Sequence, residues 1–194
     1  MMTRREVVCL LGFVLVAACF APGQTGLKFS IAPTASPAES QTPRTLSVPP
    51  DSPRWNLQGQ AKTAEYQGRK CLFLDGGLAV LNDFEMRDGV VDMDVATPAS
   101  RGFFGIQFRM ANDGANGEWV YLRQHKSGAP DAMQYTPVLN TGANWQIYNG
   151  PGFTGAVEIP KDVWFHLRLE VVGAQARFYV KDMDKAALVM NDLK

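Results

Sequence analysis

Residues 164–172 read WFHLRLEVV, and this stretch decides the fold. Apolar side chains at positions 165, 167, 169 and 171 alternate with polar side chains at positions 166, 168 and 170. Successive side chains of a β-strand point to opposite faces, so the alternation predicts a strand with one face in a core and the other in water.

The same period of two recurs between Gly-containing turns such as Asp75-Gly76-Gly77 and Asn149-Gly150, and no 3.6-residue stripe persists for three turns. Two packed antiparallel sheets are the simplest way to cover many half-apolar strands. We therefore expect an all-β, two-sheet antiparallel β-sandwich (jelly roll). The predicted strands are 71–74, 78–81, 89–96, 103–110, 118–125, 134–139, 145–148, 164–172 and 176–181.

The composition of the chain argues against some classes of function. The chain has 194 residues, of which 46% are hydrophobic and 20% charged, with 19 basic residues against 19 acidic ones. Its length fits one globular domain with appendages. A net charge of zero provides no long-range field for phosphates, so the sequence predicts no nucleic-acid partner.

The N-terminus has the features of an export signal. Arg4 and Arg5 precede an apolar run at 7–19 that is too short to span a bilayer as a helix. Its end, VAAC at 16–19, resembles the bacterial lipobox, which implies lipidation at Cys19, a membrane partner through the anchor, and a cell-envelope location. The alternative is ordinary signal cleavage near Gly23, which leaves a soluble periplasmic or secreted protein.

We expect three segments: a signal peptide at 1–18, a Pro-rich tether at 19–53 and a folded domain at 54–194. Seven of the twelve prolines lie between residues 20 and 53, among Ser, Thr, Ala and Gln. With Cys9 in the signal and Cys19 acylated, Cys71 has no intrachain disulfide partner and is expected to be a small buried hydrophobic residue.

Several of these stretches resemble a known superfamily. Residues 101–109 (RGFFGIQFR), Tyr121-Leu122-Arg123 and residues 164–180 are similar to the concanavalin A-like lectin/glucanase jelly roll, in its laminin-G-like and keto-disaccharide-hydrolase-like exported bacterial branch. The resemblance implies a carbohydrate ligand or substrate. It also implies a further C-terminal strand, so that this chain would be a truncated product.

One predicted face is suited to sugars. The strand at 118–125 places Trp119, Tyr121, Arg123 and His125 on one side. Aromatic rings offer flat area to the C–H faces of a pyranose, and Arg and Gln fix its hydroxyls. The alternative is that these rings lie in the core. The predicted carbohydrate-binding residues are Gln107, Arg109, Tyr121, Arg123, His125, Gln134, Tyr135, Trp145 and Tyr148.

Hydrolysis would need two suitably spaced carboxylates. Asp92 and Asp94 lie two apart on one strand, but a solvated pair on an outer face is the favoured interpretation. His166 is expected on the exposed side of its own strand with Arg168 and Glu170, with no assigned role. The candidate catalytic residues are Asp131, Glu118 and His125.

A carbohydrate-binding domain is therefore the first hypothesis. The alternatives are a glycoside hydrolase or lyase, which would use Asp131 or Glu118 with His125 and Arg123, and a structural or protein-interaction module. No cofactor or metal is expected. The oxygen-rich run at 112–117 resembles a calcium loop, but Gly114 breaks the ligand pattern and a hairpin turn is favoured.

Overall fold

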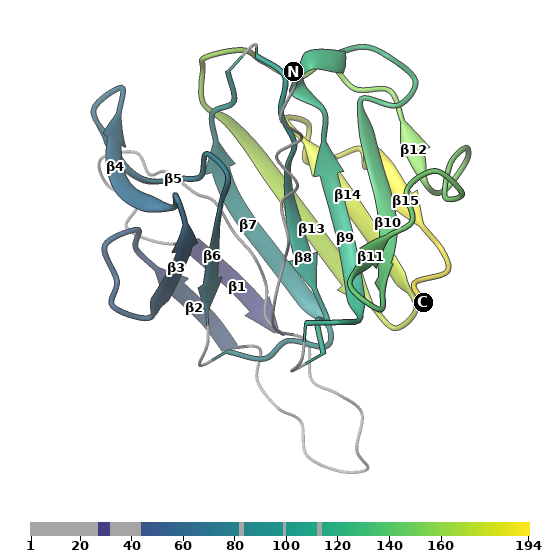
Figure 1. Cartoon of the computed structure of the whole chain (residues 1–194), viewed down its shortest axis with the longest axis horizontal. Coiled ribbons are helices and arrows are strands. Elements are labelled where there is room, and N and C mark those ends of the chain that lie inside the picture. The colour runs from purple at the N-terminus through teal and green to yellow at the C-terminus, as the bar shows by residue number, and fades with distance from the viewer. Residues whose placement is uncertain (1–26, 32–43, 82–83, 99, 112–113) are drawn as a thin grey trace, which may run out of the picture.

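The computed structural model describes residues 27–31, 44–81, 84–98, 100–111 and 114–194. Within them the chain is all-β, as the alternation predicts, with a single short 3-10 turn at Gln124–Lys126 (η1). The strands form two packed sheets and two additional strand pairs, which together make an antiparallel β-sandwich (Figure 1).

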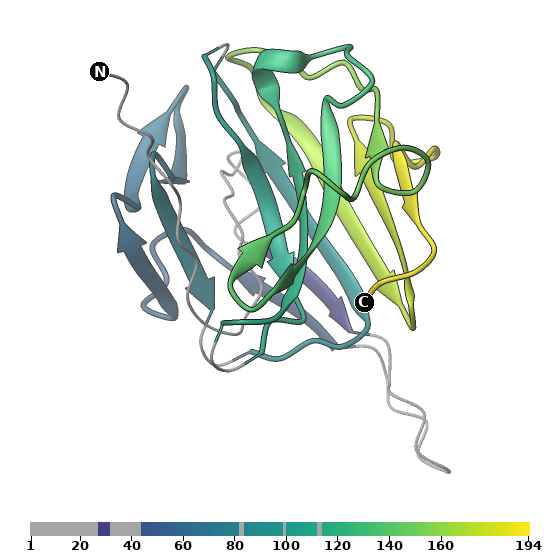
Figure 2. The same ribbon diagram turned by 45° about the vertical axis from the view of Figure 1, so that its right-hand side comes forward.

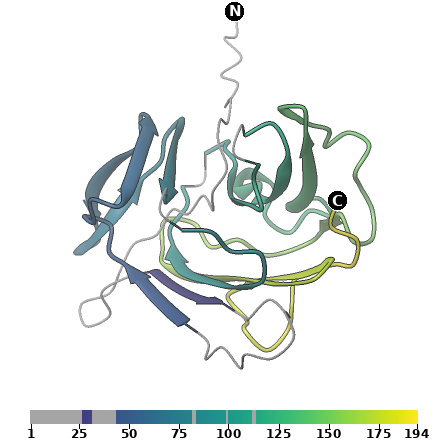
Figure 3. The same ribbon diagram turned by 90° about the horizontal axis from the view of Figure 1, so that it is seen from below.

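The larger sheet has six antiparallel strands. Their order across the sheet is β15 (Leu188–Met190), β14 (Gln175–Val180), β13 (Phe165–Val172), β7 (Gly89–Val95), β1 (Leu27–Ile31) and β2 (Arg44–Val48). Seen from below, this sheet is a curved layer with the remaining strands stacked above it (Figure 3).

The smaller sheet lies in front of the first one in Figure 1 and carries the candidate site. Its strands are, in order, β11 (Gly142–Ala143), β10 (Met133–Leu139), β9 (Gly117–Leu122) and β8 (Phe104–Phe108), and β12 (Thr154–Gly155) also pairs with β10. Two further pairs join β3 (Trp55–Gly59) to β6 (Gly77–Leu81) and β4 (Lys62–Tyr66) to β5 (Arg69–Phe73), beside the smaller sheet (Figure 2).

The core fills the space between the sheets. Leu167, Leu169 and Val171 of β13 are fully buried, while the polar residues between them are half-buried on the outer face. Ile106, Val120 and other inward side chains of the smaller sheet belong to the same buried cluster. Each buried aliphatic side chain stabilises the fold by about 1.5–3 kcal/mol, so the alternation in β13 is a major source of stability.

The tether prediction is wrong for its described part. Residues 27–31 and 44–48 are strands β1 and β2, and β1 pairs with β7 in the larger sheet. Val48 is 1% exposed. The Pro-free runs LKFSI and RTLSV have the period of two that strand formation requires. The folded part of the chain therefore begins well before residue 54.

Two other local predictions need correction. Residues 145–148, expected as a strand, form turns instead. The strand expected at 118–125 ends at Leu122, so His125 lies in the 3-10 turn η1 and not on β9. The predicted signal peptide, including Cys19, lies outside the described residues.

Candidate functional site

The outer face of the smaller sheet collects polar and aromatic side chains. Register places Gln107 opposite Trp119 and Trp119 opposite Thr136 across β8, β9 and β10. In the next row Gly105, Tyr121 and Gln134 lie side by side. The interleaved residues, such as Val120, point into the core. Tyr121 is therefore on the side of the sheet away from the core, as the alternation predicts, but it is only 2% exposed and is not itself an open sugar-facing surface.

Gly105 allows β8 to approach the β9 backbone closely at Tyr121. A Cβ atom at Gly105 would lie 2.3 Å from the Val120 carbonyl oxygen and 2.5 Å from Tyr121 Cβ. Both distances are shorter than any side chain tolerates, so only glycine fits beside Tyr121 at this position.

Arg123 is the centre of a buried network on this face. Its Nη1 donates to the Asp131 carbonyl oxygen at 2.8 Å, and its Nη2 donates to the Tyr121 hydroxyl at 3.0 Å and to Gln134 Oε1. The Tyr121 hydroxyl in turn donates to Gln134 Oε1 at 2.8 Å. We call Arg123, Tyr121 and Gln134 the Arg123 network. All three are buried, and burial raises the pKa of Tyr121 to about 12, so it is a neutral phenol at physiological pH.

The loop at 145–148 is hydrogen-bonded to this network through Gln134. Gln134 Nε2 donates to the carbonyl oxygen of Trp145 at 2.8 Å and also to that of Tyr148. These bonds hold residues 145–148 as turns against β10. A buried amide with both ends satisfied is a rigid support, because breaking either end would leave a polar group without a partner.

Aromatic rings surround the network. Tyr121 packs against Trp119 with centroids 4.3 Å apart and against Phe103 at 5.8 Å. The Arg123 guanidinium carbon lies 5.0 Å from the Tyr121 centroid and 6.0 Å from that of Trp145. Phe103 and Trp145 are 54% and 49% exposed, so their rings remain open to solvent. We call Phe103, Trp119, Tyr121 and Trp145 the ring platform.

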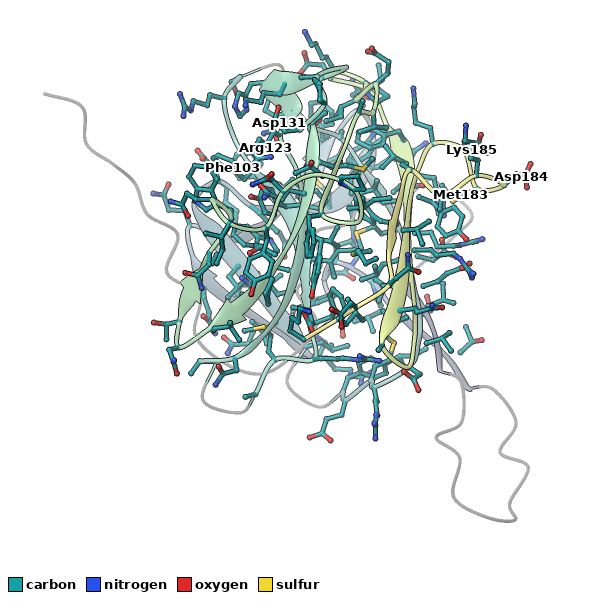
Figure 4. The ribbon with its side chains drawn as sticks, turned by 90° about the vertical axis from the view of Figure 1, so that its right-hand side faces the viewer. Phe103, Arg123, Asp131, Met183, Asp184 and Lys185 are labelled. Atoms are coloured by element: carbon teal, nitrogen blue, oxygen red, sulfur yellow. The ribbon has the colours of Figure 1, made fainter. Side chains whose placement is uncertain are left out.

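His125 and Asp131 border the platform. The His125 ring meets Phe103 at 5.7 Å, and its Nδ1 lies 3.2 Å from the Gly102 carbonyl oxygen. The Asp131 carboxylate accepts from Lys126 Nζ at 2.5 Å and lies 3.8 Å from Arg123 Nη1. The hydrogen bond from Lys126, and then the charges of Lys126 and Arg123, lower the pKa of Asp131, so this carboxylate is ionised. Figure 4 shows Phe103, Arg123 and Asp131 together at one end of the smaller sheet.

Three predicted binding residues lie elsewhere. Arg109 donates to the Arg87 carbonyl oxygen at 2.8 Å and to Asp88 Oδ1 at 2.7 Å, which ties it to the 87–88 turn. Tyr135 points into the core because it follows Gln134 on the same strand. The Tyr148 ring packs against Phe153 at 5.4 Å, and only its carbonyl oxygen contacts Gln134.

Glu118, a candidate acid, is not on the platform. It is 1% exposed and accepts a hydrogen bond from the Tyr135 hydroxyl at 2.7 Å. Burial raises the pKa of Glu118, despite the bonds that favour its charge. Glu118 faces inward because it alternates with Trp119, so it is separated by the sheet from the exposed rings.

Asp92 and Asp94 lie on the outer face of the other sheet, where they bind His166. His166 Nε2 is 2.5 Å from Asp92 Oδ1, and Nδ1 is 2.8 Å from Asp94 Oδ1. Arg168 pairs with Asp92 through two bonds, and Arg69 pairs with Asp94 at 3.4 Å. The hydrogen bonds that the His166 ring makes to the Asp92 and Asp94 carboxylates raise its pKa to about 9. The cluster is an internally paired ion network that joins β7 to β13.

Phe103, Trp119 and Lys126 are site residues absent from the predicted binding set. Alternation already placed Phe103 on the same side as Gln107, and that was the available signal. The contact of Lys126 with Asp131 depends on the η1 turn, which sequence alternation does not describe.

In the described part of the chain, no group of three His, Cys, Asp or Glu side chains is arranged to hold a metal ion. The described residues likewise contain no helix of sufficient length and hydrophobicity to cross a bilayer. The first two residues of the calcium-like run at 112–117 lie outside the described ranges. Comparison of the chain with protein-family models, curated proteins and solved structures found no match.

Proposed function

We propose that this chain is a carbohydrate-binding domain that holds a sugar on the ring platform. The observation that carries the proposal is the half-exposure of Phe103 and Trp145 above a buried hydrogen-bond network. Exposed rings provide the apolar area that pyranose C–H faces require. Because Gln134 and Arg123 fix the loop and the rings in advance, little conformational entropy is lost when a ligand binds.

We also propose that the sandwich belongs to the concanavalin A-like superfamily and has its jelly-roll topology. Two packed antiparallel sheets support this proposal, as does the position of RGFFGIQFR, whose latter part forms β8 beside β9. The fold itself is compatible with binding, hydrolysis or lysis of glycans. The choice between them therefore depends on the side chains at the site.

A glycoside hydrolase or lyase is the second candidate, favoured by the partly exposed carboxylate of Asp131 beside Arg123 and Lys126. Asp131→Asn separates the two candidates. An enzyme that uses this carboxylate would lose release of reducing or unsaturated ends in the variant, whereas a binding domain would retain its glycan.

The binding proposal is tested by affinity electrophoresis of the full chain through a panel of soluble polysaccharides. We expect Trp145→Ala and Phe103→Ala to lower the affinity by about tenfold, the usual cost of losing a central aromatic contact. Phe73→Ala is the matched control, because Phe73 is 46% exposed on the β4–β5 hairpin and outside the platform. Unretarded migration of the unmutated chain in every polysaccharide would overturn the proposal. Capture of a protein ligand through the same rings would instead favour the interaction-module alternative.

For the N-terminus we propose export and lipidation at Cys19, on the sequence pattern alone. Mass spectrometry of the mature protein decides this point. An acylated Cys19 supports a cell-envelope lipoprotein, and a free N-terminus near Gly23 supports a soluble periplasmic or secreted form.

A further inference from the structure

The positive charge of Arg123 is buried among neutral acceptors. Its side chain is 7% exposed, and its hydrogen-bond partners are the Asp131 carbonyl, the Tyr121 hydroxyl and Gln134 Oε1. The Asp131 carboxylate oxygen Oδ2 lies 3.8 Å from Arg123 Nη1, which is too long for a hydrogen bond. The guanidinium is thus solvated by dipoles and rings without being directly neutralised.

Asp131 is shared with a second cation. Lys126 Nζ approaches its carboxylate at 2.5 Å, and the Lys126 side chain is 43% exposed. Two cations therefore meet one carboxylate at this end of the platform. Glu158 accepts a hydrogen bond from the Ser127 hydroxyl at 3.1 Å. The charges of Arg123, Lys126 and Asp131 themselves sum to one net positive charge.

The position of Arg123 also changes what the rings prefer. A cation near the face of an aromatic ring is attracted by the negative potential of that face. The Arg123 guanidinium carbon lies 6.0 Å from the Trp145 centroid, so positive charge lies beside a ring that offers apolar area to a sugar. This arrangement favours a sugar that also carries a negative charge.

We propose that the glycan recognised at the ring platform is anionic, with a uronate carboxylate directed toward the Arg123–Lys126 edge while its sugar ring rests on Phe103 and Trp145. This inference rests on the proposed carbohydrate-binding function and specifies the class of its ligand. The donors of Arg123 are already used by the protein, so Lys126 and His125 make the direct contacts, and Arg123 acts through its field and by positioning Tyr121 and Trp145.

The experiment compares polygalacturonate with its fully methyl-esterified form, which has the same backbone without the charge. We expect the unmutated full chain to bind the acidic polymer more tightly, and the difference to shrink between about 50 mM and about 500 mM NaCl as screening increases. A parallel pair, dextran and dextran sulfate, distinguishes a carboxylate requirement from attraction to any polyanion. Equal or stronger binding of dextran sulfate would overturn the assignment to uronates.

Two variants with opposite expected effects test whether the uronate carboxylate binds at the Arg123–Lys126 edge. Asp131→Asn removes the shared carboxylate and should tighten binding of the acidic polymer by about two- to fivefold. Lys126→Gln should weaken it by a similar factor, and both changes should affect binding of the methyl ester less than binding of the acid. Equal affinity for acid and ester would overturn the anionic preference and leave the carbohydrate proposal standing, whereas no binding to any polysaccharide would overturn both.

Discussion

The side-chain amide of Gln134 on β10 donates to the backbone carbonyl oxygen of Trp145 at 2.8 Å, although the two residues lie 11 positions apart. The same amide oxygen accepts from Tyr121 and Arg123. One buried side chain thus connects the sheet, the buried cation and the loop that presents an exposed indole. The position of Trp145 relative to Tyr121 and Arg123 therefore depends on Gln134.

Gln134→Leu should release the 145–148 loop. The variant retains the volume of the side chain but leaves Arg123, Tyr121 and two loop carbonyls with one partner fewer, which costs about 1–3 kcal/mol of unfolding free energy. Urea denaturation measures the loss, and limited proteolysis at 145–148 reports the released loop. Gln146→Leu, at an exposed position in the same loop, is the control and should leave both readouts unchanged. Equal protease resistance of Gln134→Leu and the unmutated chain would contradict the role given to Gln134.

Gly105→Ala should displace Tyr121. The added methyl group would lie 2.3 Å from the Val120 carbonyl oxygen, so the strand or the ring must move, at a cost of about 1–3 kcal/mol. Thermal unfolding measures the loss. A changed near-ultraviolet circular dichroism spectrum reports the disturbed Trp119–Tyr121 pair. An unchanged melting temperature would show that the contact between β8 and Tyr121 is looser than described.

The protonated His166 ring stabilises the fold, and this stabilisation is lost at alkaline pH. Its folded-state pKa of about 9 is above the ordinary value of 6.5, so the folded state binds its proton more tightly than the unfolded state does. The contribution of His166 to the free energy of unfolding is complete below about pH 6.5 and is lost as the pH rises through about 9. Because the side chain is 36% exposed, screening reduces the contribution to about 1–2 kcal/mol.

The matched measurement uses His166→Gln. Urea midpoints of the two proteins at about pH 7 and about pH 10 give the difference attributable to His166, since other titrating groups are common to both. The advantage of the unmutated chain should shrink at the higher pH. A pH-independent difference would show that the imidazole is neutral in the folded protein.

Glu118 also makes the folded state less stable as the pH rises, but in the acidic range. Burial raises its pKa above the ordinary 4.5, so ionisation is less favourable in the folded state, and this penalty develops as the pH rises past 4.5. The stability of Glu118→Gln relative to the unmutated chain should therefore increase between about pH 4 and about pH 7. Chemical denaturation at both pH values checks this, and a constant difference would place the carboxylate in a more solvated setting.

Alternation predicted most of the strands and the side of the smaller sheet on which Tyr121 lies, opposite to Val120, but not that Tyr121 and Arg123 are buried there. It failed where tertiary contacts override local pattern. Residues 145–148 read WQIY, which has a strand-like pattern, but Gln134 holds them as turns. Gln134 and Tyr135 were grouped together as binding residues, although neighbours in a strand must point to opposite faces.

Composition misled the assignment of the N-terminal region in a different way. Prolines dominate the average of residues 20–53 and conceal two five-residue alternating runs. The strands β1 and β2 pair with each other, and β1 also pairs with β7, which lies far away in the sequence. The local sequence permits these strands, and the pairing with β7 completes them. Contacts of this kind have no signal within a short sequence window.

The place of β1 inside the larger sheet limits how far the domain can travel. If Cys19 carries the lipid, seven residues separate it from Leu27, and a chain extends at most about 3.5 Å per residue. The chain between them then spans at most about 25 Å. Such a protein would sit close against its bilayer and capture polymers that reach the membrane surface, without sweeping through the space beyond.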